Sequence, residues 1–129
     1  MGEAKRFSEY ISEFCNLAED AKRGFTWHYE EVNRMDKLTQ DYLHLLELGG
    51  LDYRERAKIA TQIAKCRQSR RMCKDATEVL EPFVQFIESD RGKNLLNLVR
   101  EVLGKTRRVE ERMETRTYIP RILEQEDAQ

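Results

Sequence analysis

Proline and glycine are scarce in this sequence, whose 129 residues include two prolines and six glycines. So few helix-breaking residues exclude a collagen-like or low-complexity chain. There is also no run of about 18 apolar residues, so no membrane-spanning segment is expected. Residues 1–6 lead into an amphipathic pattern and not into an apolar stretch. We therefore expect no secretory signal and a cytoplasmic location.

Cysteine is also rare, with Cys15, Cys66 and Cys73 and no Cys-x-x-Cys pair. On a helix, Cys66 and Cys73 lie roughly 10 Å apart along the axis. That separation is too large for a disulfide, which needs Cα atoms within about 7 Å. We interpret the three thiols as small buried apolar groups in a reducing compartment.

The sequence contains no motif typical of a catalytic or metal site. His28 and His44 each precede a glutamate by three residues. A helical di-iron site also needs matching Glu-x-x-His pairs on facing helices, and there are none. No cysteine has an activating partner nearby in the sequence, and Gly49-Gly50 lacks the pattern of a phosphate-binding loop. We therefore expect no metal, no cofactor and no enzymatic activity.

Three long segments have the apolar spacing of amphipathic helices. Apolar side chains recur every three or four residues over 3–48, 53–89 and 93–116. No long run alternates with period two, so no strand is predicted. Short connections make long helices turn back on their neighbours. The predicted fold is therefore all-α, an antiparallel bundle of three long helices that forms one domain over residues 1–116.

The breaks between these segments are short and well marked. Gly49-Gly50 and Ser89-Asp90 separate the three predicted helices. Gly24 is a weak point at which the first helix splits in two in an alternative four-helix arrangement. Residues 117–129 are predicted to be an extended C-terminal tail that folds back over the bundle or docks on a neighbouring chain.

Positive and negative charges are unevenly distributed along the chain. Residues 1–50 carry 6 bases and 10 acids, residues 51–116 carry 16 and 11, and residues 117–129 carry 1 and 3, which gives the net charge of −1. A globally basic nucleic-acid binder is not indicated. Two interpretations stay open: the acidic first helix neutralises the basic half within the fold, or the basic half faces an anionic partner.

The candidate anion-binding residues are basic side chains of the second and third predicted helices, which antiparallel packing would bring together. Like charges four residues apart on a helix are unfavourable, so acids across the bundle or an anionic ligand must compensate. No aromatic residue lies between Tyr53 and Phe83, which disfavours single-stranded nucleic acid but not a duplex backbone. The set comprises Lys65, Arg67, Arg70, Arg71, Lys74, Lys105, Arg107, Arg108 and Arg112.

The candidate partner-binding residues are Trp27, His28 and Tyr29. Consecutive aromatic side chains point to different sides of a helix, so not all of them can face one core. Tryptophan and tyrosine are favoured at interfaces, but packing in the core or under the tail also stays open. The third helix is shorter than the first and leaves part of the first helix's apolar stripe uncovered. This predicts a homodimer.

The C-terminal part reads GKTRRVEERM at 104–113 and YIPR at 118–121. In this pattern of charged and apolar residues, the chain resembles small uncharacterised helical proteins of Gram-positive bacteria and their prophages. The resemblance covers most of the chain. It implies a protein of mobile elements, some of which inhibit host defence nucleases by presenting charged surfaces.

These observations predict a non-enzymatic helical interaction protein that acts through a charged and aromatic surface and self-associates. The alternative is a nucleic-acid-binding or defence-inhibiting mobile-element protein that uses a basic face on the second and third helices. The expected partner is therefore a protein or a second copy of the chain, with nucleic acid as the alternative and no membrane.

Overall fold

The computed structural model describes residues 4–122, which contain three helices: α1 (Phe7–Leu48), α2 (Tyr53–Glu88) and α3 (Asp90–Thr115). No strand occurs within this range. The predicted all-α bundle of three long helices is therefore confirmed. α1 passes through Gly24 as one helix, so the alternative split into two does not occur. No helix among residues 4–122 is long and apolar enough to cross a membrane.

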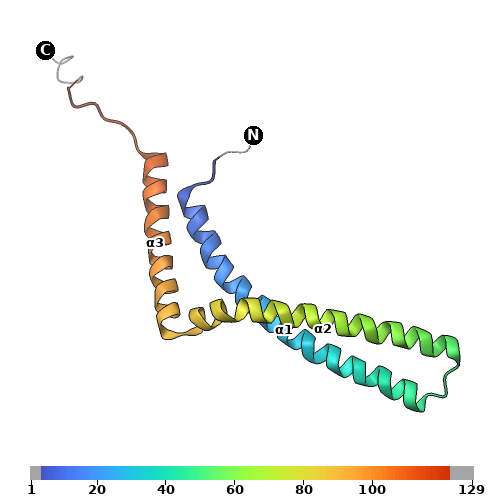
Figure 1. Ribbon diagram of the computed structural model, residues 1–129. Helices are drawn as coiled ribbons and strands as arrows, with labels where there is room; N and C mark the ends of the chain where they lie inside the picture. The colour runs from blue at the N-terminus through green and yellow to red at the C-terminus, as the bar shows by residue number, and fades with distance from the viewer. Residues whose placement is uncertain (1–3, 123–129) are drawn as a thin grey trace.

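The three helices form two arms that meet at a corner (Figure 1). In the hairpin arm, the second half of α1 runs antiparallel to α2, and the chain reverses at Gly49-Gly50. In the α1–α3 arm, the first half of α1 runs antiparallel to α3. Ion pairs join Arg6 to Glu114 and Glu19 to Arg100 along this second arm. α1 is therefore the only helix shared by both arms along their length.

The prediction that α3 folds back along α2 is wrong, because α3 turns away from α2 and lies beside the first half of α1 (Figure 1). The cause is the single-residue connection at Ser89. Its backbone N–H donates to the carbonyl oxygen of Gln85, and its side-chain oxygen accepts a hydrogen bond from the N–H of Gly92 at 3.1 Å. Ser89 therefore ends α2 and caps α3 at once, and α3 begins three residues earlier than predicted.

The three helices share a small core at the corner. Ala18 of α1, Ile87 of α2 and Leu96 of α3 are buried together, and Phe83 packs against them. Gly92 is also buried, and a Cβ added to it would lie 1.8 Å from the carbonyl oxygen of Phe86. Only glycine lets the first turn of α3 approach the last turn of α2 so closely.

The heptad spacing of the sequence places Leu95, Val99, Val102, Thr106, Val109 and Met113 on one apolar face of the third helix, but the structure buries a neighbouring face. Side chains assigned to the core, including Leu95, Val102 and Met113, are exposed, whereas Leu96 and Leu103 are buried. The reason is that α3 carries two adjacent apolar stripes. It buries one of them against α1 and leaves the other uncovered.

The described part of the C-terminal tail does not fold back over the bundle. Residues 116–120 are extended and lead away from the α1–α3 arm (Figure 1). Tyr118 is 82% exposed, and Ile119 and Ile122 are also exposed. For residues 117–122 the first of the two predicted placements is therefore wrong, and residues 123–129 of the predicted tail lie outside the described range.

Gly92→Ala tests the close approach at the corner. The added methyl group meets backbone, which cannot give way as a side chain can, so the free energy of unfolding falls by about 2–3 kcal/mol. Gly104→Ala is the matched control, because no atom lies within 4 Å of its added Cβ, and it raises stability by about 0.5–1 kcal/mol. Urea unfolding of both variants measures the difference, and equal midpoints would contradict the structure.

Candidate interaction surfaces

The hairpin arm carries an excess of positive charge on α2. Residues 53–74 contain eight basic side chains and one acidic one. From α1, Asp36 accepts a hydrogen bond from Nε of Arg70 at 2.6 Å and lies 3.8 Å from Nη1 of Arg67. One carboxylate therefore serves two arginines.

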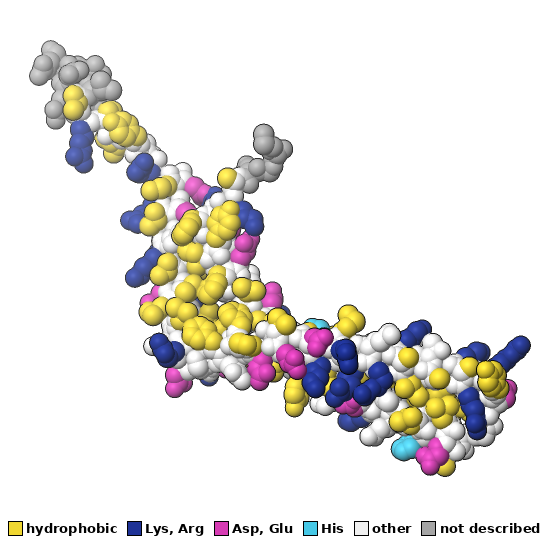
Figure 2. Space-filling view, viewed as in Figure 1, with side chains coloured by type: hydrophobic (Ala, Val, Ile, Leu, Met, Phe, Trp, Pro, Cys, Tyr) yellow, Lys and Arg dark blue, Asp and Glu magenta, His cyan; other side chains and the backbone are white. Residues whose placement is uncertain are grey.

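The other cations of this run stay in solvent. Within residues 4–122, Lys65, Arg71 and Lys74 form no ion pair, and all three side chains are exposed. Figure 2 shows a cluster of Lys and Arg side chains along the middle of the hairpin arm. Asp36 neutralises part of the basic run, as the first interpretation of the charge asymmetry expects, and the second interpretation, an anionic partner, stays a prediction.

The basic residues of α3 belong to the other arm, so the predicted joint basic face of the second and third helices does not form. α3 leaves α2 at the corner, and this separates Lys65–Lys74 from Lys105–Arg112 along two different arms (Figure 1). The α3 cations are themselves divided. Lys105, Arg108 and Arg112 line an open hollow of about 740 Å³, whereas Arg107 lines another.

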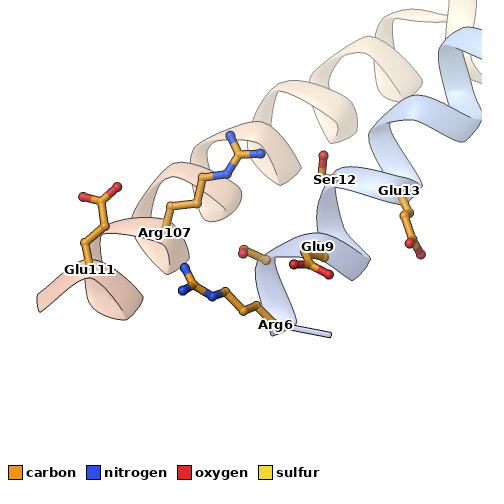
Figure 3. A pocket seen from close by; sticks show the side chains of 7 residues that line it. Arg6, Glu9, Ser12, Glu13, Arg107 and Glu111 are labelled. Carbon is orange, nitrogen blue, oxygen red and sulfur yellow. The ribbon is translucent and has the colours of Figure 1, made fainter. Parts of the chain in front are cut away.

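The hollow beside Arg107 lies between α1 and α3 and holds side chains of both signs (Figure 3). It has a volume of about 520 Å³. Its two arginines, Arg6 and Arg107, are matched by Glu9, Glu13 and Glu111. Because the charges of this hollow largely cancel, it is a poor site for a polyanion.

Trp27, His28 and Tyr29 do not form one surface. Trp27 and Tyr29 are both more than half exposed, but residues two apart on a helix point about 200° apart around its axis. Trp27 contacts His28 edge to face at 4.9 Å between ring centroids, and Tyr29 stacks on Phe25 at 6.3 Å. The described part of the tail, up to Ile122, does not cover them. The two exposed rings therefore lie on opposite sides of the hairpin arm.

A polar cluster lies next to His28 on α1. Glu31 accepts hydrogen bonds from Arg34, which lowers the pKa of the Glu31 carboxyl and raises the pKa of the Arg34 guanidinium. Nδ1 of His28 is buried and has no hydrogen-bond partner. No group of three His, Cys, Asp or Glu side chains in the described chain is placed to hold a metal ion.

The sequence predicted an uncovered part of the apolar stripe of α1, but it missed the larger apolar surface that α1 and α3 leave open together. It lies on the α1–α3 arm, where hydrophobic side chains gather over both helices in Figure 2. We call it the open face. The sequence does contain the signal, because each helix has two neighbouring heptad stripes offset by one residue. The open face comprises Phe7, Tyr10, Phe14 and Leu17 of α1 with Leu95, Leu98, Val102, Val109 and Met113 of α3.

No protein-family model, curated protein or solved structure matches this chain. The resemblance to helical proteins of Gram-positive bacteria and their prophages therefore stays a prediction.

The buried thiols provide a test of the non-catalytic interpretation. Burial raises the pKa of the Cys73 thiol, and the nearby Glu31 carboxylate raises it further, so the reactive thiolate is depleted near neutral pH. We expect Cys73 to react with iodoacetamide at pH 7.5 at least about tenfold more slowly in the folded chain than in urea. Peptide mass spectrometry over time measures the rates. Faster labelling in the folded chain would identify an activated thiol.

Proposed function

We propose that this chain is a non-enzymatic, cytoplasmic helical interaction protein that self-associates and binds an acidic protein surface through its hairpin arm. The observation that supports this function most directly is the exposed cationic run on α2, of which Asp36 neutralises only part. A fold that needed these charges for its own stability would pair more of them with α1.

The exposed aromatic rings support the same assignment. Trp27 lies in a shallow hollow with Lys22, Arg23 and Glu30, so an apolar ring is surrounded by charged groups. Interfaces favour such surroundings, where a central ring is desolvated and charges at the rim orient the partner. Tyr29 offers a second ring on the opposite side of α1.

Charge reversal on each arm tests where the partner binds. Arg71→Glu with Lys74→Glu changes the hairpin arm, and Lys105→Glu with Arg112→Glu makes the same charge change on the α1–α3 arm. Each form is immobilised and exposed to nuclease-treated lysate of the native host, and retained proteins are identified by mass spectrometry. We expect a protein that the wild type and the α3 variant retain and that the α2 variant loses.

Two outcomes of this retention experiment would contradict the proposal. Equal retention by the two double variants would show that the α2 cations do not bind the partner. A protein that wild type retains from untreated lysate but not from nuclease-treated lysate would be bridged by nucleic acid and would not support the proposal. Trp27→Ala weakens retention if the ring contributes to the same surface.

Duplex nucleic acid is the second candidate, and the specific observation in its favour is the run of eight bases with one acid on α2. Phosphate backbones need only cations in reach, and each phosphate contact makes binding weaken as salt rises. A defence-inhibiting role at a nuclease would use the same charges as the binding of an acidic protein.

Asp36→Asn tests this second candidate by freeing Arg67 and Arg70. If α2 binds a duplex, affinity for a 30-base-pair DNA in low salt rises by about three- to tenfold, and the slope against salt steepens. Asp41→Asn is the matched control, because it makes the same charge change at an exposed α1 site with no ion pair among residues 4–122. Equal affinities for the two variants, measured by fluorescence anisotropy, would contradict duplex binding.

A further inference from the structure

One heptad stripe of α1, which we call the seam, is buried along the hairpin arm and exposed along the α1–α3 arm. Every seventh residue from position 7 to position 42 lies on this seam. Ala21 and Met35 are buried where α2 covers them, whereas Phe7 is 69% exposed and Phe14 is 38% exposed. The seam opens because α2 ends at Glu88, close to the corner, and α3 packs on a different side of α1.

Each helix of the α1–α3 arm therefore has one stripe that is buried against the other helix, the used stripe, and one exposed apolar stripe, the free stripe. On α1, the used stripe includes Ser8, Cys15 and Ala18, and the free stripe lies one residue earlier along the sequence. On α3, the used stripe includes Leu96 and Leu103, and the free stripe again lies one residue earlier.

Two adjacent stripes are typical of a helix that packs against two neighbours, as every helix in a four-helix bundle does. In an antiparallel pair, stripes offset in the same sense lie on the same side. The two free stripes therefore lie on the same side of the arm, and Figure 2 shows hydrophobic side chains over both of its helices.

We infer that the open face is the site at which a second copy of this chain binds, so that two α1–α3 arms form a four-helix bundle across a twofold axis. This inference rests on the self-association proposed above. The open face holds nine large apolar side chains, which are together about half exposed. At about 200 Å² for each side chain, one copy offers on the order of 900 Å², compared with about 800 Å² per partner in a standard specific interface.

The composition of the arm favours a second copy over an unrelated occupant. On the α1 side, the interface between α1 and α3 consists of the small side chains Ser8, Cys15 and Ala18, which bury little apolar area. Such a pair needs another layer of helices for stability. A second copy supplies two antiparallel helices of matching length, and each stripe then faces a stripe of the same kind.

The tail is a weaker candidate for the same surface. Its described part leads away from the arm, and its apolar side chains are in solvent. The described part of the tail is a short segment that ends at Ile122, whereas the open face consists of two helical stripes. This described part therefore cannot cover a face that extends along most of α3.

Leu98→Glu in the full-length chain tests the inference. Leu98 is 55% exposed in one chain, so glutamate is tolerated in the monomer but is buried twice in a symmetric dimer. We expect wild type to have twice the chain's mass of 15.4 kDa by light scattering. We expect Leu98→Glu to raise the dimer dissociation constant at least about 100-fold.

Two matched controls locate the interface. Leu43→Glu changes a leucine of the hairpin arm that is 49% exposed, and Ile119→Glu changes the tail. Both should leave the dissociation constant unchanged. Dimers that resist Leu98→Glu, or that dissociate equally with Leu43→Glu or Ile119→Glu, would overturn the inference.

Hydrogen exchange of wild type gives a second measurement that needs no variant. The amides of α1 residues 7–17 and of α3 should gain protection as protein concentration rises, whereas those near the hairpin turn should not. A wild-type chain that stays monomeric at about 100 μM would contradict both the inference and the proposed self-association. A dimer that Trp27→Ala disrupts and Leu98→Glu does not would contradict this inference and leave self-association standing.

Discussion

The close contact between the last turn of α2 and the first turn of α3 determines the shape of the whole molecule. Ser89 is the only residue between the two helices, and the short approach at Gly92 leaves no room for a Cβ. A longer connection would let α3 turn fully and lie along α2. With one residue, α3 starts before the chain can reverse, and its Leu96 packs in the core with Ala18 of α1. The corner therefore commits α1 to pack against two partners in succession, α3 first and α2 afterwards.

This arrangement also decides where the charges lie. If α3 lay along α2, Glu110, Glu111 and Glu114 would be available to the basic run of α2. Instead, Glu114 pairs with Arg6 at the far end of the other arm, and α2 depends on Asp36. The exposed positive surface of the hairpin arm and the exposed apolar surface of the α1–α3 arm thus have one common cause.

Much of the fold could be predicted from the sequence, because the helices and their ends depend on local sequence patterns. Heptad spacing and the Gly49-Gly50 and Ser89-Asp90 breaks predicted three helices with ends within a few residues of those observed. The buried side of α3 could not be predicted from the sequence, because two apolar stripes lie side by side on this helix and tertiary contact decides which one is buried. The candidate sites could also be predicted only in part, because they depend on which helices pack together. Arg67 and Arg70 do face an acid of α1, but the joint basic face required α2 and α3 to be neighbours along their length.

The two surfaces also constrain each other. Hairpin arms with unpaired cations repel when they lie side by side, and that repulsion opposes self-association through α2. Pairing through the open face keeps both hairpin arms outside the interface and leaves their charges in solvent. Such a dimer presents two identical basic rods on one rigid bundle. If the proposed function is correct, an anionic partner with repeated sites would bind the second rod at a high effective concentration, and modest contacts on each arm would produce a much tighter complex. The corner at Ser89 and Gly92 is what separates the apolar contact from the charged one in a chain of this length.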